Sequence, residues 1–353
     1  MSGAWRKDEH LFFSLSRSPG RADFKDISFV HNCLPDIDLA DVSIETSMLG
    51  RTFRSPLFFN ALTGGTRQSK IINAKLAAAA RKMDLPMAVG SQMTALHNRG
   101  REESFRIVRC INPRGFVMAN IGSYADPQMA ERAVKMIRAD ALQIHLNTPQ
   151  ELAMAEGDRQ FRGTMERIKQ IVSVSSKPVI VKEVGFGIAR EEAEMLIQSG
   201  VRAIDVGGRG GTNFLVIESM RAGKHLSAGI AGWGINTAIS IVETNAVSRK
   251  GIDIMATGGL HNALDIAKAI SLGASAIGIA AYPLHLMLKK GFNTLINWIA
   301  DVEKELRIVM LMTGASSLVD LRTVPLVITG KTAEWMKRRD IDPDLFARRQ
   351  KCR

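Results

Sequence analysis

The sequence has few cysteines, and their pattern excludes two kinds of cross-link. Cys33, Cys110 and Cys352 are the three cysteines in 353 residues. Their number is odd, they are widely spaced and no C-x-x-C motif occurs, so neither a disulfide framework nor a structural zinc site is indicated. This usage is typical of a protein from a reducing compartment.

Long hydrophobic runs are also missing. The longest, near residues 274–288, is interrupted by Tyr282, Pro283 and His285, so no transmembrane helix is expected. The first ten residues contain no apolar segment of the kind found in secretory signals. We therefore expect a cytoplasmic protein that has no membrane partner.

Tyrosine is scarce, with two residues, and no basic stretch is interleaved with aromatic residues. The formal net charge of +12 would suit nucleic acid, an acidic membrane surface or a small anionic substrate. Lys and Arg are spread through the whole chain, however, with one modest cluster at residues 337–339 and a basic C-terminus. This distribution argues against a nucleic-acid partner.

What the sequence does contain is an alternation of short apolar strands and amphipathic helices after about residue 55. Apolar residues make up 46% of the chain, enough to bury a sizeable core. The expected strands are residues 57–60, 87–90, 116–120, 142–145, 179–182, 203–206, 253–256 and 276–279, and the clearest helices are 69–82, 128–138, 189–199 and 263–272. Eight such units predict an α/β fold of the TIM (β/α)8 barrel type, with an open doubly wound sheet as the alternative.

We expect residues 1–353 to form a single domain. Residues 1–54 show little periodicity and form an N-terminal arm that caps the barrel or reaches over its mouth. The barrel strands and helices occupy residues 55–283. Residues 284–353 form a C-terminal extension, with two helices within 284–313, an extended segment at 323–328 and a basic tail.

The stretch from Ala139 to Glu151 carries the most chemistry. A short apolar strand ends at His145, and Asn147, Gln150 and Glu151 follow within six residues. In a barrel such residues gather at the carboxyl end of the strands, where ligands bind. His, Asn and Gln offer donors and acceptors, and a Glu carboxylate is a ready ligand for Mg²⁺.

Other strand ends indicate a bound ring with a phosphate. The first three expected strands end in small or amide residues, at 61–66, 90–92 and 120–122. Such residues let a flat ring lie against the backbone. Lys182 places a cation at a barrel mouth, where either Glu183 or a ligand could be its partner. Gly258-Gly259 and Ala280-Ala281 lack the side chains that would obstruct a phosphate cup after the last two strands. This combination is what FMN requires.

These motifs resemble those of the type 2, flavin-dependent isopentenyl diphosphate isomerases, over nearly the whole chain. In order, the matching motifs are Thr63-Gly64-Gly65, Gly90-Ser91-Gln92, Asn120, His145 to Glu151, Lys182 to Gly185, the 207–213 loop and Gly258-Gly259. The resemblance implies that FMN is bound by Ala61, Leu62, Thr63, Ser91, Asn120, Lys182, Thr212, Gly258, Gly259, Ala280 and Ala281.

The resemblance also implies how substrate and metal are bound. Arg6, Lys7, His10, Asn147 and Gln150 would bind an allylic or homoallylic diphosphate. Glu151 would hold Mg²⁺ against it. One position departs from the family, because some members carry Arg after Ser-Gln, where this chain has Met93.

The activity that the resemblance implies is interconversion of isopentenyl and dimethylallyl diphosphate by a 1,3-proton shift, in isoprenoid biosynthesis. The flavin would be reduced by NADPH, and Gln150, His145 and Lys182 would form the catalytic set. A homo-oligomer, either a tetramer or an octamer, is usual in the family.

Three alternatives are open from the residues. A 2-hydroxy-acid oxidase on the same barrel would need a His with a nearby Arg at a late strand end, and residues 257–260 lack that pair, although His261 follows. A dehydrogenase with a catalytic cysteine would need Cys after the sixth strand, where residues 207–232 have none. A basic binding protein without activity would not bind flavin.

Overall fold

The structure is a computed structural model that describes residues 9–10, 12–13, 15–16, 18–223, 226–248 and 251–350. Of the predicted site residues, Arg6 and Lys7 lie outside the described residues. The remaining predicted positions can all be located.

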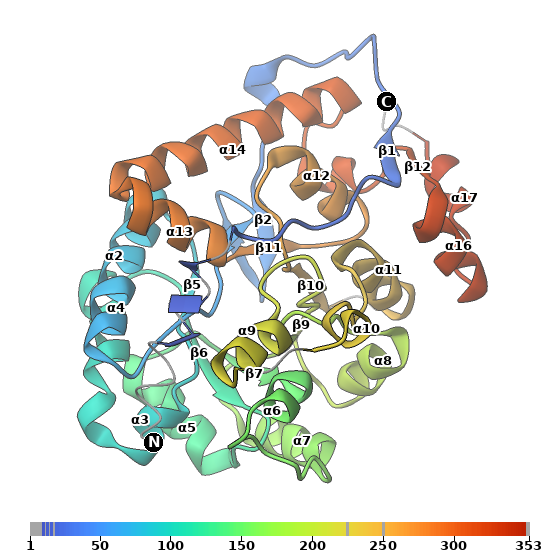
Figure 1. The fold of residues 1–353 in the computed structure, drawn as a ribbon. Helices are drawn as coiled ribbons and strands as arrows, with labels where there is room; N and C mark the ends of the chain where they lie inside the picture. The colour runs from blue at the N-terminus through green and yellow to red at the C-terminus, as the bar shows by residue number, and fades with distance from the viewer. Residues whose placement is uncertain are drawn as a thin grey trace.

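A closed barrel of eight parallel strands forms the centre of the molecule (Figure 1). The strands are β4 (Leu57–Phe59), β5 (Met87–Ala88), β6 (Val117–Gly122), β7 (Ala141–Leu146), β8 (Val179–Glu183), β9 (Ala203–Asp205), β10 (Asp253–Ala256) and β11 (Ala276–Ile279). The last strand pairs with the first, with Ile277 opposite Leu57. The barrel prediction and all eight predicted strands are confirmed, and the open sheet is excluded.

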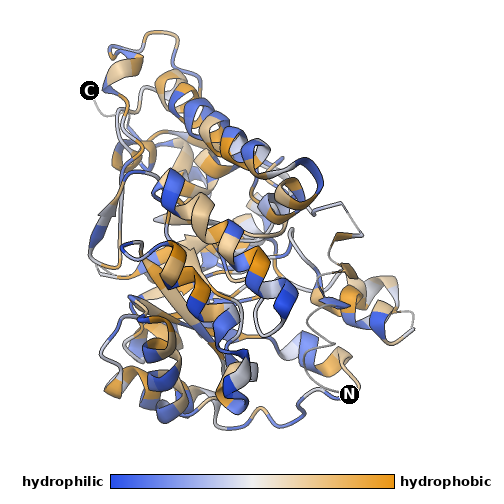
Figure 2. Cartoon of the chain, turned by 90° about the vertical axis from the view of Figure 1, so that its left-hand side faces the viewer, coloured by the Kyte–Doolittle hydropathy of each residue, from blue (hydrophilic) through white to orange (hydrophobic). Residues whose placement is uncertain are grey.

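Helices surround the barrel. Those up to β9 are α2 (Arg67–Met83), α3 (Met93–His97), α4 (Glu103–Ile111), α5 (Pro127–Ile137), α6 (Thr148–Ala153), α7 (Thr164–Val174) and α8 (Arg190–Gln198), with a 3-10 turn, η2 (Arg99–Arg101). Those after it are α9 (Phe214–Arg221), α10 (Ala228–Ala231), α11 (Thr237–Val247), α12 (Ala263–Ser271), α13 (Ala281–Lys290), α14 (Phe292–Thr313), α15 (Leu318–Leu321), α16 (Gly330–Arg338) and α17 (Asp344–Ala347). Apolar and polar residues alternate around these helices (Figure 2), as expected for helices with one face on the barrel.

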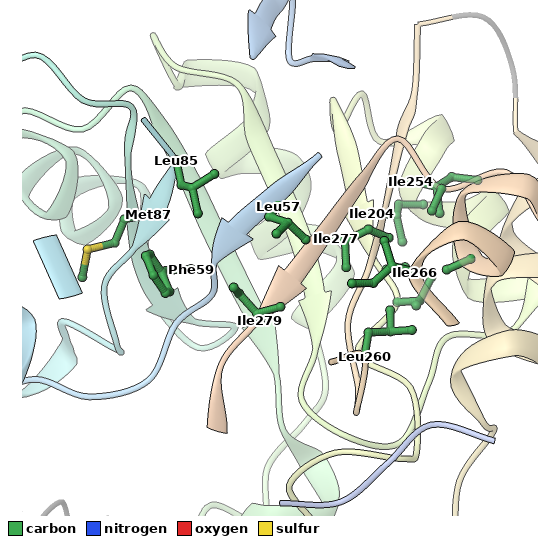
Figure 3. Packing of buried hydrophobic residues seen from close by; sticks show 14 of the residues in the cluster. Leu57, Phe59, Leu85, Met87, Ile204, Ile254, Leu260, Ile266, Ile277 and Ile279 are labelled. Carbon is green, nitrogen blue, oxygen red and sulfur yellow. The ribbon is translucent and has the colours of Figure 1, made fainter. Parts of the chain in front are cut away.

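Two hydrophobic layers hold the barrel together. Outward-facing residues such as Leu57, Ile254 and Ile277 pack against helix residues such as Ile266 (Figure 3). A smaller cluster fills the barrel interior, where Phe58 and Met118 are fully buried. Burying one such side chain contributes about 1.5–3 kcal/mol.

The N-terminal arm contacts both ends of the barrel. Its hairpin of β2 (Thr46–Met48) and β3 (Arg51–Phe53) closes the end where the strands begin, and Met48 joins the interior cluster. At the opposite end the backbone N–H of Ala22 donates to the carbonyl of Gly259 over 2.9 Å. Between them, β1 (Ile27–Phe29) pairs antiparallel with β12 (Leu326–Ile328), which joins the arm to the C-terminal extension.

Within the described part of the chain, every helix is too short or too polar to cross a membrane. The longest, α14, begins after Gly291 and contains Asp301, Glu303 and Lys304. Gly291 also separates it from α13, which confirms the two predicted helices after the barrel.

Candidate active site

The candidate site is a pocket of about 230 Å³ at the carboxyl ends of the barrel strands. Loops from around the barrel and residues 19–20 of the arm contribute to its wall. The predicted residues that line it are His10, Ala61, Leu62, Thr63, Ser91, Asn120, His145, Asn147, Gln150, Glu151, Thr212, Gly258, Gly259, Ala280 and Ala281. The structure therefore brings together fifteen predicted positions from His10 to Ala281.

Lys182 lies differently from the other predicted residues. It is 5% exposed and is not among the lining residues, although Glu183 beside it is. Its ammonium donates to the backbone carbonyl of Glu183 over 2.8 Å and lies 3.9 Å from a carboxylate oxygen of Asp205. The protein partners of Lys182 are thus a carbonyl and Asp205, and the Glu183 carboxylate is used elsewhere.

The Glu183 carboxylate shapes the loop that follows β8. One of its oxygens accepts hydrogen bonds from the backbone N–H groups of Val184, Gly185 and Phe186, at 2.6–2.9 Å. Burial raises the pKa of Glu183 to about 7, against the opposing effect of these three bonds. The loop is therefore turned tightly around a buried carboxyl group, which holds the wall of the pocket in place.

A chain of hydrogen bonds crosses the barrel interior below the pocket. Asn60 donates to Asp205 over 2.7 Å, and Gln143 donates to Asn60 over 3.1 Å. Asn120 donates to Gln143 over 3.0 Å, and the Nδ1 atom of His145 lies 2.8 Å from the Asn120 oxygen. Each of these three amides donates from its NH2 group to the neighbour on the Asp205 side, and its oxygen accepts from the neighbour on the His145 side.

This order of donors determines the state of His145. Because the Asn120 amide donates to Gln143, its oxygen is left to accept, so the His145 Nδ1 atom must carry a proton. The chain ends at an acceptor, Asp205, whose oxygens also accept from the Thr257 hydroxyl and lie near Lys182. Burial raises the pKa of Asp205, and the Lys182 charge and these hydrogen bonds oppose the rise.

The sequence analysis did not identify Asn60, Gln143 and Asp205 as site residues. The available signal was their position, since each is a polar residue in or directly after a strand that is otherwise apolar. A polar side chain inside a barrel must find a partner there. Which partner it finds depends on the strand register, and the sequence does not specify that register.

Residues after β7 form the other side of the pocket. The Asn147 amide donates to one oxygen of Glu151 over 2.8 Å, and the backbone N–H of Asp158 donates to the other over 2.9 Å. Gln150, in the first turn of α6, donates to Glu218 over 3.0 Å. The carboxylate of Glu151 is thereby fixed in orientation while its remaining lone pairs stay able to bind a cation.

Glu218, on α9, is the residue beside the pocket that the sequence analysis missed most plainly. It is 1% exposed, and it pairs with His10 over 2.5 Å and with Arg221. Burial raises its pKa, but His10, Gln150 and Arg221 together hold the pKa of Glu218 below its usual range. A lone acidic residue in an apolar helix was the signal. Through Glu218, the arm residue His10 is connected to Gln150.

The glycine loops after β9 and β10 pack directly on one another. Gly258 has φ of 112°, and a Cβ there would lie 2.1 Å from the Gly208 carbonyl oxygen. Gly259 has φ of 86°, and its Cβ would lie 2.2 Å from the Gly210 carbonyl oxygen. Only glycine fits both the space and the left-handed backbone. This part of the pocket wall is therefore bare backbone.

Comparison with known proteins first gives the class. Residues 100–327 match the model of the family FMN-dependent dehydrogenase. A solved mandelate oxidase with an FMN adduct covers 90% of this chain and 95% of its own, with a TM-score of 0.64 and 18% identity, a likeness in fold. The chain is thus a member of a class of FMN-dependent barrel proteins.

The closer relatives give the particular family. The isopentenyl-diphosphate delta-isomerase of Moorella thermoacetica is 46% identical over 95% of this chain and 96% of its own length. That of Symbiobacterium thermophilum is 43% identical over 99% and 96%. The chain belongs to the FMN-dependent, type 2 isopentenyl-diphosphate isomerase family, which confirms the resemblance in the sequence, and it is an enzyme.

The residues of the pocket fit FMN. Bare backbone at Gly258 and Gly259 and a buried ring nitrogen of His261 without a hydrogen-bond partner are suited to a flat ring with a phosphate, and Lys182 adds a buried cation next to the lining residue Glu183. A bound metal ion is a different case. The described residues contain no group of three or more His, Cys, Asp or Glu that could hold a metal. Glu151 alone would bind Mg²⁺ only if the substrate supplied further oxygen ligands.

Proposed function

We propose that the protein interconverts isopentenyl and dimethylallyl diphosphate by a 1,3-proton shift, with reduced FMN and Mg²⁺. The observation that carries this proposal is the pairing of the neutral Gln150 amide with the buried Glu218 and His10 in a pocket that holds FMN. A hydroxy-acid oxidase would place an arginine there, and a thiol-dependent dehydrogenase a cysteine. The described lining of the pocket contains neither residue type.

The proposed roles follow from the contacts. Bound, reduced FMN supplies proton transfer at the substrate carbons, so no strong acid from the protein is needed there. Gln150, oriented by Glu218, positions the isoprenoid carbons, and His145 offers its ring to the substrate. Asn147 and His10, with Arg6 and Lys7, bind the diphosphate. Glu151 would hold Mg²⁺, which neutralises diphosphate charge without entering the chemistry.

Lys182 completes the proposed catalytic set as a source of positive charge. Its ammonium is almost fully buried and close to the buried Asp205. A cation fixed in a region of low dielectric favours negative charge that appears nearby during reaction. NADPH is the proposed reductant of the flavin.

The decisive experiment separates an isomerase from an oxidoreductase on the same fold. An isomerase returns its flavin to the reduced state in each turnover, whereas an oxidase or dehydrogenase passes two electrons for each product. Under anaerobic conditions, enzyme reduced once with dithionite and given isopentenyl diphosphate and Mg²⁺ should form many equivalents of dimethylallyl diphosphate while the flavin stays reduced. In heavy water the product should contain deuterium.

Two results would overturn the proposal. One is product formation that stops at about one equivalent for each flavin. The other is reoxidation of the flavin by the substrate in step with conversion. Both would restore the oxidoreductase alternatives.

The proposed assembly and compartment follow from the family. A tetramer or octamer that acts in the cytoplasm is proposed, and sedimentation velocity of the holoenzyme would test the assembly.

A further inference from the structure

His261 occupies the end of the pocket that none of the roles above uses. It follows Leu260, which is buried beside Ile266 in the layer between the barrel and α12 (Figure 3). Its ring stacks on Tyr282, with centroids 4.5 Å apart and planes 12° apart, and Tyr282 in turn contacts Trp298. Both rings line the pocket beside Gly259 and Ala281. Stacking therefore holds the imidazole in one orientation at the ends of β10 and β11.

The Nε2 atom of this ring is buried without a hydrogen-bond partner among the described residues. The ring has a hydrogen bond to the backbone of Gly20, in the arm. A buried ring nitrogen without a partner costs free energy that a bound ligand can recover. Nε2 is thus available to a ligand in the pocket.

Charge indicates the kind of ligand. The described residues that line the pocket include no Lys or Arg. The wall at this end of the pocket is mostly bare backbone, so it supplies no positive side chain. Ala280, the N-cap residue of α13, provides no side-chain cap, so the first backbone N–H groups of that ten-residue helix have no capping side chain. A phosphate dianion here would meet these N–H groups, and it would need a cation to balance the rest of its charge.

We propose that His261 becomes protonated when FMN binds and donates a charge-assisted hydrogen bond from Nε2 to the phosphate of the flavin. Binding of FMN is then coupled to uptake of a proton, and His261 discriminates FMN from riboflavin. The proposal deepens the assignment of FMN as the cofactor and is independent of the isomerase reaction.

The surroundings of the ring determine the direction of this coupling. Burial lowers the pKa of His261, Arg21 in the arm lowers it further, and Asp265 on α12 together with the Gly20 backbone opposes this. Lys268, also on α12, donates to the Phe24 carbonyl, and the stacked Tyr282 belongs to α13. The free protein therefore holds a neutral imidazole at pH 7.

A bound phosphate raises that pKa. Proton uptake on binding then occurs between the low pKa of the free ring and the higher pKa of the complex. As pH rises through this interval, FMN affinity falls by up to about tenfold per pH unit. Riboflavin affinity does not change, because riboflavin has no phosphate.

The test uses apoprotein, obtained by removing flavin, and measures FMN and riboflavin dissociation constants by flavin fluorescence from about pH 7 upward, where the FMN phosphate is already mostly dianionic. Titration calorimetry in buffers of different ionisation enthalpy measures the proton taken up. His261→Gln should weaken FMN binding by about 10- to 100-fold, leave riboflavin binding unchanged and abolish proton uptake. His261→Arg should keep the preference for FMN and lose the pH dependence. His97→Gln, at an exposed histidine outside the pocket lining, is the matched control.

Three outcomes would overturn the role of His261. Equal losses for FMN and riboflavin in His261→Gln would show that the ring only supports the fold of the pocket. Unchanged FMN affinity, or binding without proton uptake in the unmodified protein, would show that Nε2 does not contact the phosphate. Failure of the unmodified apoprotein to bind either flavin would instead contradict the cofactor itself, which distinguishes the two assignments.

Discussion

Lys182 is proposed to be important for activity without dominating the affinity for flavin. The ammonium is buried beside Asp205 and donates to the Glu183 carbonyl. One cation adds little to a flavin affinity that ring stacking and phosphate contacts dominate. It acts fully, however, on charge that develops during the reaction.

Lys182→Ala should therefore lower kcat by on the order of 100-fold and weaken FMN binding much less. Stopped-flow assays and fluorescence titration of the apoprotein measure the two quantities. Lys177→Ala, at an exposed lysine just before the same strand, should change neither. If the Lys182 variant loses flavin while its holo fraction keeps full turnover, Lys182 has no role in the chemistry.

Glu151 is the residue on which the metal proposal depends. Its two oxygens are held by Asn147 and by the Asp158 backbone, so the carboxylate has a fixed direction. An amide oxygen is a much weaker ligand for Mg²⁺ than a carboxylate oxygen, and Glu151→Gln should raise the Mg²⁺ concentration for half-maximal activity by on the order of tenfold or more. An unchanged Mg²⁺ titration would exclude Glu151 from the metal site, and Glu166→Gln on the exposed face of α7 is the control.

His10 and Gln150 meet at the same Glu218 carboxylate but should affect different kinetic constants. His10→Ala would remove a proposed contact to the diphosphate and should mainly raise KM. Gln150→Ala would remove the group proposed to position the reacting carbons and should mainly lower kcat. Steady-state kinetics with saturating Mg²⁺ and reduced flavin measure both, and the reverse pattern would exchange the two roles.

At the scale of elements, Arg109 connects α4 to the segments around β6 and β7. Its guanidinium donates to the carbonyls of Ile137, Gly115 and Arg138 and to the Asp140 carboxylate, over 2.7–3.1 Å. Arg109 is 7% exposed, so removing it would leave several buried acceptors unpaired.

Arg109→Ala should lower the free energy of unfolding by about 3–5 kcal/mol. Chemical denaturation of the holoenzyme measures the change. Arg106→Ala, which removes an exposed ion pair to Glu102 on the same helix, should change stability little. Equal effects of the two variants would show that the buried contacts of Arg109 are not responsible for the loss of stability.

At the scale of the whole molecule, Glu243 attaches the C-terminal extension to the barrel. The side chain of Glu243 on α11 is fully buried, and it accepts from Trp335 over 2.7 Å and from the guanidinium of Arg339 over 3.0 Å. Burial raises its pKa, but Arg339, Trp335 and the Arg190 backbone together hold the pKa of Glu243 below its ordinary value of 4.5. This lowered pKa gives the attachment a defined pH dependence.

A lowered carboxyl pKa contributes stability that is present above pH 4.5 and is lost as the pH falls through the pKa of the folded protein. Glu243→Gln should cost about 1–3 kcal/mol at neutral pH, and its difference from the unmodified protein should shrink as the pH falls from 4.5 through the lowered pKa of the folded protein. Urea unfolding at both pH values measures this. Glu334→Gln, at an exposed ion pair on α16, is the control, and a difference independent of pH would contradict the argument.

Local patterns predicted most of the fold. Eight strands, four barrel helices and the two helices split at Gly291 are where the sequence places them, because apolar periodicity and glycine act over a few residues. The arm is the exception. Its hairpin and the β1–β12 pair form between segments that are weak in isolation, and β12 lies about 300 residues from β1.

The site residues also divide into those that local sequence patterns indicate and those that only the tertiary structure brings together. Strand-end motifs indicated His145, Gln150 and Glu151 as pocket residues, because polar residues that directly follow an apolar strand can be recognised in the local sequence.

The sequence by itself determined the barrel, the flavin pocket at its carboxyl end and the family. Only the tertiary structure decided which polar groups are partners. Asp205 and His145 are connected through three amides, which lie on β6, on β7 itself and in the loop after β4. Glu218 joins His10 to Gln150 across more than 200 residues of chain. Barrel closure and strand register create these contacts, and a buried polar group acquires its protonation state and role from such neighbours.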